Sequence, residues 1–409
     1  MLKGKCVVIG VTGSIAAYKI ANLASALVKL HADVNVIMTK NATNFINPIT
    51  FETLTGNKCL VDTFDRNFQF QVEHVSLAKR ADIFLVAPAS ANVIGKMANG
   101  IADDMLTTTI LAAKCPKLIS PAMNTNMYEN PIVQDNIKKL SDYGFEIINP
   151  ASGYLACGDT GAGKMPEPET LLSYILQTIA FQKDMSGKRV LITAGPTQEK
   201  IDPVRYITNH STGKMGYELA IHCARRGAKV TLVAGPTALE DPLFVETVHV
   251  ISAAEMADAV KSRFEEEDIV IMPAAVADYR PINPADEKIK KDQSDANGNV
   301  IALERTEDIL MSLGKIKRKD QFLCGFSMET ENMLENSRTK LSKKNADMIV
   351  ANNLRTKGAG FGTDTNVVTL ITADACRELE LMSKADVAAA IMDEILASLT
   401  QSEYKLRLS

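Results

Sequence analysis

Short apolar runs, each followed by a glycine-rich turn and an amphipathic stretch, recur along the chain. Residues 4–10 lead from a Gly-Lys pair through a β-branched apolar run to a glycine, and residues 187–195 repeat that order. Such a run is typical of the first buried strand of a parallel α/β sheet. We therefore predict two α/β domains in series, each with a Rossmann-like parallel sheet, over residues 1–180 and 188–409, with a linker at 181–187.

The same pattern predicts the main elements of each domain. In the first, we expect a helix over residues 15–30, with apolar residues such as Ile20, Leu23 and Leu27 on one face, and a closing helix over 171–180. In the second, the helix after the first strand starts near Ser211 or Thr212 and runs to Arg226. The predicted strands are 6–10, 33–38, 83–87 and 118–120 in the first domain, and a run ending at 195, 229–234, 269–272 and a run ending near 325–330 in the second.

Bulk composition narrows the class of protein. The 409 residues are 46% hydrophobic and 23% charged, with a net charge of -4, so no basic field indicates nucleic acid. The sequence has neither an apolar run of about 18 residues nor a signal-peptide pattern, and we expect a cytoplasmic protein without a membrane partner. Seven cysteines without a CxxC pair argue against disulfides and against a zinc site.

The first strand-to-helix turn is a candidate phosphate site. Gly13 and Ser14 precede a predicted helix, whose N-terminus offers free N–H groups to an anion. Strand-to-helix turns also favour Gly and Ser for local reasons, so this motif alone leaves both interpretations open. The next strand ends in Thr39, where a dinucleotide fold places Asp or Glu. Thr39 in place of an acidic residue argues against NAD as the ligand and favours a mononucleotide whose phosphate is held by Ser14 and Thr39.

Small and polar residues follow the next two strands of this half. Residues 88–92 and 121–127 lie where open α/β sheets bind ligands, and small side chains there let a flat ring approach the backbone. Residues 153–165 are rich in glycine and contain Cys157, which suits a mobile flap. A lone cysteine is often a small buried residue, but neighbouring Gly and Asp argue against that interpretation.

Together, the motifs at 13–19, 88–92, 121–124 and 155–158 resemble the flavin-containing cysteine decarboxylases of coenzyme A biosynthesis, over roughly residues 3 to 175. The resemblance implies that FMN oxidises the substrate thiol, so that the resulting thioaldehyde stabilises the carbanion left by CO2 loss. It implies His74 as the base or another proton-transfer group, although a lone His is more often structural. It also implies Asn124 and Met123 at the substrate carboxylate, and Cys157 as proton donor. The implied FMN contacts are Gly13, Ser14, Thr39, Ser90 and Asn92.

The second half lacks the glycine fingerprint of a dinucleotide site. A long insertion delays its first helix, and residues 211–214 are not a Walker loop, because position 207 is Ile rather than Gly. Lysines follow several strands: Lys288 in one loop, and Lys340 and Lys344 on one helix face. Concentrated lysines favour a polyphosphate ligand, while a solvated lysine face is the ordinary alternative for any single cluster.

Motifs at 195–197, 205–211 and 274–279, with Lys288, Phe326, Lys340 and Lys344, resemble the phosphopantothenate–cysteine ligases, over residues 188 to about 400. Thr212 stands where we expect a second Ser. The resemblance implies CTP, an acyl-cytidylate and Mg2+ held mainly by the CTP phosphates, with no metal site of the protein's own. Lys288 and Asn209 are the implied catalytic residues, and Arg205, Asn209 and Ala274 contact the substrate. The implied CTP contacts are Met272, Pro273, Ala274, Asp278, Lys288, Glu307, Asp308, Ile309, Leu310, Phe326, Lys340 and Lys344.

Two domains in this order resemble the bacterial bifunctional arrangement, with small-molecule substrates 4'-phosphopantothenate, cysteine and CTP. The resemblance also implies a homo-oligomer, with trimeric flavin domains, dimeric ligase domains and a dodecamer. The alternatives are a flavin-dependent decarboxylase of another substrate fused to a nicotinamide-binding domain, and a non-catalytic regulatory relative. The combination of His74, Asn124 and Cys157 argues against the regulatory alternative.

Overall fold

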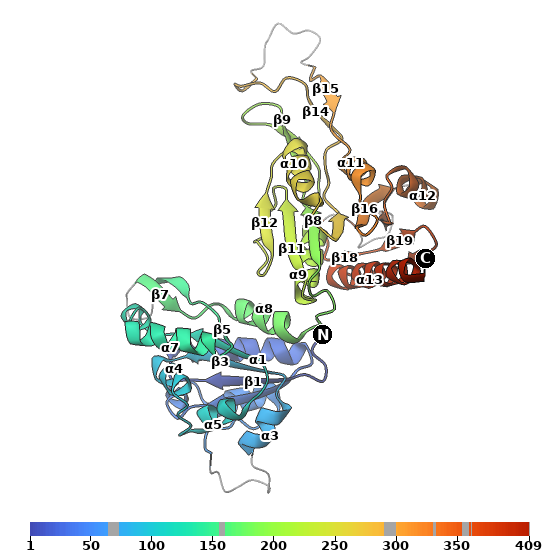
Figure 1. Ribbon diagram of the computed structural model, residues 1–409. Coiled ribbons are helices and arrows are strands. Elements are labelled where there is room, and N and C mark those ends of the chain that lie inside the picture. The colour runs from blue at the N-terminus through green and yellow to red at the C-terminus, as the bar shows by residue number, and fades with distance from the viewer. Residues whose placement is uncertain are drawn as a thin grey trace. The chain divides into compact units, whose positions relative to one another are not determined.

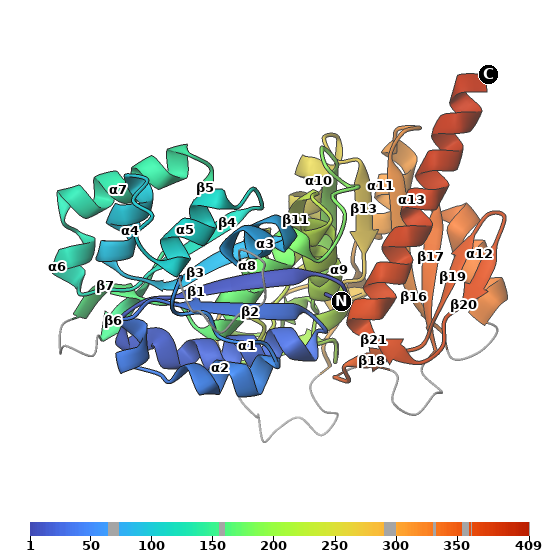
Figure 2. The ribbon, with the colours of Figure 1, turned by 90° about the horizontal axis from the view of Figure 1, so that it is seen from below.

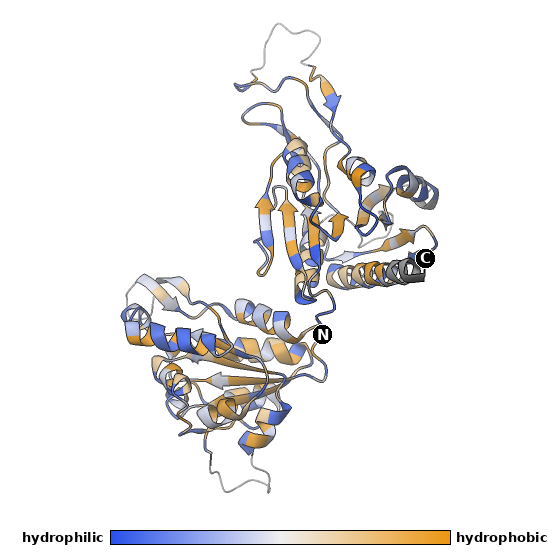
Figure 3. Cartoon of the chain, in the orientation of Figure 1, coloured by the Kyte–Doolittle hydropathy of each residue, from blue (hydrophilic) through white to orange (hydrophobic). Residues whose placement is uncertain are grey.

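The computed structural model describes residues 1–63, 73–154, 160–289, 300–329, 333–353, 360 and 362–408. The chain divides into two compact units, the N-terminal unit (Met1–Gln182) and the C-terminal unit (Lys183–Ser409). Each has a central sheet with helices on both faces (Figure 1), and the predicted α/β class is confirmed. In both units, the central strands are coloured mainly as hydrophobic in Figure 3, and the buried residues of these strands and of the flanking helices form the cores.

The sheet of the N-terminal unit has five parallel strands in the order β2-β1-β3-β4-β5. Helices α1 and α8 cover one face and α3, α4, α5 and α7 the other (Figure 2), so that the strands are buried on both sides. The strands are β1 (Cys6–Val11), β2 (Asp33–Met38), β3 (Ile83–Ala89), β4 (Lys117–Pro121) and β5 (Phe145–Ile147), and a separate hairpin pairs β6 (Ala151–Tyr154) with β7 (Thr160–Lys164). The helices are η1 (Ile15–Tyr18), α1 (Lys19–Lys29), η2 (Ala42–Asn44), α2 (Pro48–Thr55), α3 (Glu73–Arg80), α4 (Ala91–Ala98), α5 (Met105–Ala112), α6 (Thr125–Tyr128), α7 (Pro131–Asp142) and α8 (Pro168–Ile179).

The first helix differs from the single helix predicted over residues 15–30. It begins with the 3₁₀ turn η1, and the α-helix proper starts at Lys19. The Ser14 hydroxyl accepts a hydrogen bond from the Ala16 N–H at 3.4 Å, which caps this tight first turn. The turn therefore places Gly13 and Ser14 directly at the end of β1.

The sheet of the C-terminal unit has eight strands in the order β12-β11-β8-β13-β16-β17-β19-β20. The strands from β12 to β17 are parallel, whereas β19 and β20 extend that edge in antiparallel fashion. Helices α9 and α13 pack on one face, and α10, α11 and α12 on the other. The strands are β8 (Arg189–Ala194), β11 (Lys229–Ala234), β12 (Glu246–His249), β13 (Ile269–Met272), β16 (Phe322–Glu329), β17 (Met348–Asn353), β19 (Val368–Thr372) and β20 (Cys376–Glu378), and the helices are α9 (Lys214–Arg225), α10 (Ala253–Phe264), α11 (Ile309–Ile316), α12 (Met333–Lys343) and α13 (Lys384–Leu408).

Three short antiparallel pairs leave this sheet. They are β9 (Gln198–Lys200) with β10 (Tyr206–Thr208), β14 (Tyr279–Pro281) with β15 (Leu303–Arg305), and β18 (Thr365–Asn366) with β21 (Met382–Ser383). The first pair forms within the predicted insertion, and α9 begins at Lys214 rather than at Ser211 or Thr212. The reason is Gly213, whose φ of 79° is left-handed and whose added Cβ would lie 2.8 Å from Thr237. Among the described residues, no helix combines the length and apolarity needed to cross a membrane.

Candidate active sites

In the N-terminal unit, the carboxyl ends of β1, β2 and β3 are tied together at one edge of the sheet. The Thr12 hydroxyl donates to the Pro88 carbonyl at 2.6 Å and accepts from the Ser90 N–H at 2.9 Å. The Thr39 N–H donates to the Val11 carbonyl at 3.0 Å. These bonds bring Gly13, Ser14, Thr39 and Ser90 to one edge, with Asn92 exposed in the first turn of α4.

The backbone at this edge is closely packed. A Cβ on Gly13 would lie 2.8 Å from the Asn41 Cβ, so only glycine allows the β1 turn to approach this loop. Thr39 is buried, and its hydroxyl accepts from the Ala42 N–H at 3.3 Å. Its hydroxyl therefore also holds the turn after β2.

Two buried hydroxyls next to the predicted substrate loop lack a hydrogen-bond partner within the described chain. They are Ser120 Oγ, at the end of β4, and Thr125 Oγ1, in the first turn of α6. Buried polar groups are nearly always paired in native proteins, so unsatisfied hydroxyls at a strand end indicate a bound polar group. This edge therefore fits a flavin, which combines a phosphate for the β1 turn with a polar ring.

The loop that contains Asn124 packs against β7. Asn124 caps α6, since its Oδ1 accepts from the Asn126 N–H at 2.9 Å. The Met123 N–H donates to the Gly163 carbonyl at 3.1 Å, and a Cβ on Gly163 would lie 2.4 Å from the Met123 oxygen. The β6–β7 hairpin therefore rests on the predicted substrate loop. Cys157 belongs to the segment between these strands, which lies outside the described residues.

His74 is the second residue of α3 and is half-buried. Helix α3 leads into β3, the strand in the middle of the sheet, and packs against α5 on one face. A helix that connects to a parallel strand runs antiparallel to it, so the N-terminal end of α3 faces the carboxyl edge. His74 therefore lies on the side of the sheet where the other predicted residues gather, on an element separate from that of Asn124.

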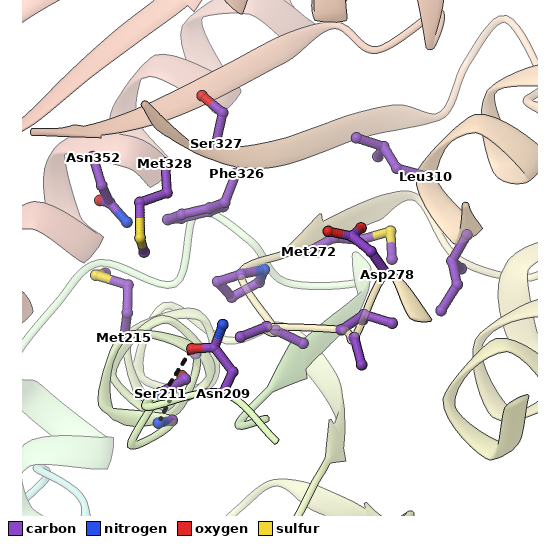
Figure 4. Close-up of a pocket in the computed structure, with 18 of the residues that line it drawn as sticks. Asn209, Ser211, Met215, Met272, Asp278, Leu310, Phe326, Ser327, Met328 and Asn352 are labelled. Atoms are coloured by element: carbon purple, nitrogen blue, oxygen red, sulfur yellow. Dashed lines mark hydrogen bonds between the residues drawn. The ribbon is translucent and has the colours of Figure 1, made fainter. Parts of the chain in front are cut away.

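The C-terminal unit contains a cavity of about 640 Å³ at the carboxyl ends of β13 and β16 (Figure 4). Every residue that the sequence predicted for CTP except Lys288 lines this cavity, and so does Asn209. The predicted residues around it are Asn209, Met272, Pro273, Ala274, Asp278, Glu307, Asp308, Ile309, Leu310, Phe326, Lys340 and Lys344.

Two threonines at the end of β8 position one wall of the cavity. Thr193 Oγ1 accepts from the Ala274 N–H at 3.2 Å, and Thr197 Oγ1 accepts from the Ala277 N–H at 3.0 Å. The Thr197 carbonyl in turn accepts from the Thr208 hydroxyl at 2.8 Å, which holds the end of β10 in place. Asn209 follows directly, and its Oδ1 accepts from the Ser211 N–H at 3.1 Å (Figure 4). The insertion thus carries Asn209 to the cavity beside the Ala274 loop.

The opposite wall carries charged groups that are already paired. Asp308 caps α11 through the Met311 N–H at 3.0 Å and pairs with Lys344 at 3.1 Å. Hydrogen bonds from Lys261 and Ser312 hold the pKa of Glu307 below its ordinary value. Both carboxylates are thus structurally engaged, and they fix the position of the 305–310 segment.

Arg205 and Lys288 do not line the cavity. Arg205 Nε donates to Asp202 at 2.9 Å, and this contact keeps the pKa of Asp202 well below its ordinary value. Asp202 also accepts from the Ile289 N–H at 3.2 Å, next to Lys288. The structure therefore brings the segments of these two predicted residues together in a separate cationic cluster on the β9–β10 arm.

The sequence analysis missed one side of the cavity. Lys214 is the last residue of the Ser-Thr-Gly-Lys run, which gave a signal that we set aside because the run is not a Walker loop. Asn352, Asn366 and Lys384 come from β17, β18 and the start of α13, where no motif marks them. The missed lining residues also include Ser211, Met215, Arg305, Thr306, Ser327 and Met328.

No group of three His, Cys, Asp or Glu side chains within the described ranges is arranged to hold a metal ion. The polar lining of the cavity includes lysines, amides and carboxylates, together with hydroxyl groups and Arg305.

The fold defines a two-unit α/β protein with a candidate ligand site at the carboxyl edge of each sheet. Two family models match the chain, Flavoprotein over residues 1–180 and DNA/pantothenate metabolism flavoprotein C-terminal domain over residues 185–399. The chain belongs to the family of the coenzyme A biosynthesis bifunctional proteins CoaBC.

One relative, the coenzyme A biosynthesis bifunctional protein CoaBC of Bacillus subtilis (strain 168), is 48% identical over 97% of this chain and 98% of its own length. Another, a cysteine/cysteine sulfinic acid decarboxylase of an unknown prokaryotic organism, is 46% identical over 86% of this chain and 99% of its own length. The crystal structure of the C-terminal domain of a CoaBC protein is 48% identical, covers 53% of this chain and 99% of that chain, and has a TM-score of 0.45.

Proposed function

We propose that the C-terminal unit joins 4'-phosphopantothenate to cysteine at the expense of CTP, and that the N-terminal unit decarboxylates the product to 4'-phosphopantetheine. The chain belongs to a family of bifunctional enzymes with a decarboxylase and a ligase activity. The observation that carries the ligase part of the proposal is the cavity around which Asn209, the Ala274 loop, Asp278, Lys340 of α12 and Lys344 directly after it gather.

The ligase reaction begins when a carboxylate oxygen of 4'-phosphopantothenate attacks the α-phosphorus of CTP. The α–β phosphoanhydride bond breaks, pyrophosphate leaves, and an acyl-cytidylate forms. Lys340 and Lys344 are cationic groups at the cavity wall, and preorganised cations stabilise charge that grows on a transferring phosphoryl group. Asn209 holds the acyl-cytidylate while cysteine attacks. The CTP phosphates would hold Mg2+, whose charge would offset theirs.

We further propose that the arm cluster of Arg205 and Lys288 binds the phosphate end of the acidic substrate. Arg205 donates to Asp202 through Nε and Nη2, and Nη2 also reaches the Ile289 carbonyl at 3.2 Å. Nη1 has no hydrogen-bond partner among the described residues, and Lys288, which precedes Ile289 in the chain, is exposed. A guanidinium with an adjacent ammonium suits a phosphate. Because neither residue lines the cavity, we propose one long substrate bound at both ends rather than direct contact of Lys288 with CTP.

In the N-terminal unit, Gly13, Ser14, Thr39, Ser90 and Asn92 would hold FMN. When bound, FMN would supply two-electron redox chemistry, taking a hydride from the carbon that bears the substrate thiol and later returning it. Asn124 and Met123 receive the substrate carboxylate in the loop beneath β7, where an amide donor suits a group that leaves as neutral CO2. His74 takes the thiol proton, and Cys157 returns a proton to the product.

Exposed apolar residues support the oligomer implied by the resemblance. Ile15, Tyr18 and Ile49 are exposed near the β1 turn, which supports a trimer of N-terminal units, and Tyr206 is exposed on the β9–β10 arm, which supports a dimer of C-terminal units. We propose a cytoplasmic dodecamer. Native mass spectrometry of the full chain tests this, because a monomer or a plain dimer as the main species rejects it.

A second candidate for the N-terminal unit is decarboxylation of free cysteine, and the relative named for cysteine and cysteine sulfinic acid favours it. One experiment tests both candidates: the purified protein with FMN, Mg2+, CTP, 4'-phosphopantothenate and cysteine, followed by mass spectrometry. Formation of 4'-phosphopantetheine with CMP and pyrophosphate supports the proposal. Cysteamine without CTP consumption supports the second candidate, and untouched CTP rejects the ligase assignment.

A further inference from the structure

The cavity of the C-terminal unit has two sides of different chemistry. Figure 4 shows Asp278, Met272 and Leu310 on one side, and Met215, Phe326, Met328 and Asn352 gathered on the other. The predicted nucleotide residues occupy the first side. Apart from Phe326, the second side, which we call the thioether side, consists of residues that the proposed function has not used.

The thioether side also contains two lysines at helix N-termini. Lys214 begins α9 and pairs with Asp364 at 2.7 Å, and Lys384 begins α13 while its N–H donates to the Asp364 carbonyl at 2.9 Å. Both lysines line the cavity. A lysine at a helix N-terminus is disfavoured by the helix dipole, so two of them at one site call for an anionic partner.

Of the two lysines, Lys384 is the better candidate for binding an anionic ligand. It is only 6% exposed, and its ammonium donates to the Thr363 carbonyl at 2.5 Å and the Gly360 carbonyl at 3.5 Å. An ammonium has three donors, so one remains. None of the carboxylates in the described part of the chain forms an ion pair with it, whereas Lys214 already has Asp364. Burial, with the neighbouring charge of Lys214, lowers the pKa of Lys384.

Two amides and two thioethers complete this side. Asn366 is 3% exposed and donates to Asn352 Oδ1 at 3.0 Å, so the pair is fixed in orientation. Met215 and Met328 point toward the same space as the Phe326 ring (Figure 4). A buried ammonium with nearby amides suits a carboxylate, and thioethers with an aromatic ring suit a thiol. A polyphosphate would need several unpaired donors here rather than one.

We propose that the thioether side is the cysteine subsite of the ligase, with Lys384 binding the cysteine carboxylate and Met215, Met328 and Phe326 enclosing its thiol. The inference rests on the proposed function. The cysteine nitrogen attacks the acyl carbon of the acyl-cytidylate near Asn209, the C–N bond forms, and the acyl C–O bond breaks. CMP leaves with the electron pair, and the amine proton passes to solvent. A cation beside the amino acid also favours the neutral, nucleophilic amine.

The test compares cysteine with cysteamine, which has the same amine and thiol but no carboxylate, by CMP release from the full-length protein. In the wild type we expect kcat/KM for cysteine to exceed that for cysteamine by about 10- to 100-fold, the effect of one charged hydrogen bond. In Lys384→Met, the value for cysteine falls to that for cysteamine, which itself changes less than about threefold. Lys384→Arg restores part of the preference.

The matched control is Lys343→Met, the same change at an exposed position of α12 that does not line the cavity, and it retains the full preference. Exchange of labelled pyrophosphate into CTP, with 4'-phosphopantothenate and without cysteine, isolates the first half-reaction and stays within about threefold in Lys384→Met, since Lys384 contacts only the second substrate.

Three outcomes overturn the inference. The first is an equal kcat/KM for cysteine and cysteamine in the wild type. This outcome needs no variant, so the inference can be disproved even if Lys384→Met does not fold. A rise of the KM for CTP in Lys384→Met with unchanged amine preference assigns the lysine to the nucleotide. Absence of exchange in the wild type rejects the proposed function, and the subsite with it, whereas exchange with equal use of both amines rejects the subsite alone.

Discussion

The two units start with the same strand and diverge at the turn after it. In the N-terminal unit, Gly13 and Ser14 lead from β1 directly into η1 and α1, so the turn itself is available to an anion. In the C-terminal unit, the β9–β10 pair intervenes between β8 and α9 and carries Asn209 to the cavity. The same architecture therefore carries two different candidate sites, and the connection between the first strand and the first α-helix is longer in the C-terminal unit than in the N-terminal unit.

The units also differ in how closely their helices approach. In α11 of the C-terminal unit, a Cβ on Gly314 would lie 1.9 Å from the Lys344 carbonyl oxygen, whereas in α4 of the N-terminal unit a Cβ on Gly95 would meet only the Asn136 amide at 3.8 Å. The close approach places Lys344 and α12 beside the cavity. The candidate nucleotide site therefore depends on packing at a glycine, whereas Gly95 in α4 of the N-terminal unit has no such close backbone contact.

The largest expected effect is that of Gly314→Ala. Alanine favours a helix over glycine, but here its methyl group overlaps backbone, and we expect the C-terminal unit to lose about 4 kcal/mol of unfolding free energy. Hydrogen exchange with mass spectrometry on the full chain resolves the two units. The control Gly95→Ala has the same change inside a helix with free space, and it should leave the N-terminal unit unchanged or more stable by about 1 kcal/mol. Equal changes in unfolding free energy for Gly314→Ala and Gly95→Ala would contradict the proposed difference in helix packing between the two units.

The next effect concerns Arg226, which pairs with Asp184 and Asp393 at the end of α9. The Arg226 side chain is mostly buried and its pKa is raised, mainly by the bond to Asp184. Arg226→Met removes both ion pairs of this mostly buried guanidinium, and we expect a loss of about 2–3 kcal/mol, measured by urea unfolding. Adding Asp184→Asn to Arg226→Met should recover part of the loss, and no recovery in the double variant would disprove this ion-pair account.

A pH effect confined to the C-terminal unit comes from His222 on α9. Burial, with help from Arg226, lowers the pKa of His222 from 6.5 to about 4. Because the unfolded chain binds this proton first, stability is unaffected above pH 6.5 and falls as the pH drops toward 4, by about 2 kcal/mol at pH 5. His222→Gln should flatten the pH dependence of the urea midpoint between pH 6.5 and 5, and an unchanged slope would show that another group titrates there.

The smallest effect is expected from an exposed ion pair of the N-terminal unit. Lys138 and Asp142 lie one turn apart on α7 at 2.6 Å, and both are largely exposed. Lys138→Met should change the unfolding free energy by less than about 0.5 kcal/mol, because solvent screens such pairs. A loss near that of Arg226→Met, in the same urea series, would mean that burial does not explain the difference between the two ion pairs.

Buried strands were the most predictable part of the fold. Residues 33–38 form β2 with the predicted bounds, and β1, β3 and β4 begin or end within two residues of the prediction. Helix starts were less predictable, because the cap at Ser14 and the left-handed Gly213 decide them through local geometry that periodicity does not contain. The antiparallel strands β19 and β20 carry no motif, and the sequence analysis did not anticipate them.

The candidate site could be predicted where it follows a strand in a recognisable motif, as with Asp278 and Phe326. Lys384 and Asn366 are brought to the cavity by β18, β21 and α13, which lie far along the chain from the other lining residues. Tertiary packing alone brings them there, and so no local pattern marks them. Arg205 and Lys288 are the opposite case. The sequence motifs that contain them are recognisable, but those motifs do not reveal that the two residues lie outside the cavity.

The central claim is that each unit carries its own site, and two variants of the full chain test it most directly. Given CTP, Mg2+, 4'-phosphopantothenate, cysteine and FMN, Asn124→Asp should accumulate phosphopantothenoylcysteine, whereas Asn209→Asp should make none but still decarboxylate it when it is supplied. Mass spectrometry of an equal mixture should then show 4'-phosphopantetheine at a rate near that of the wild type. Failure of Asn124→Asp to ligate, or of Asn209→Asp to decarboxylate, would contradict the account.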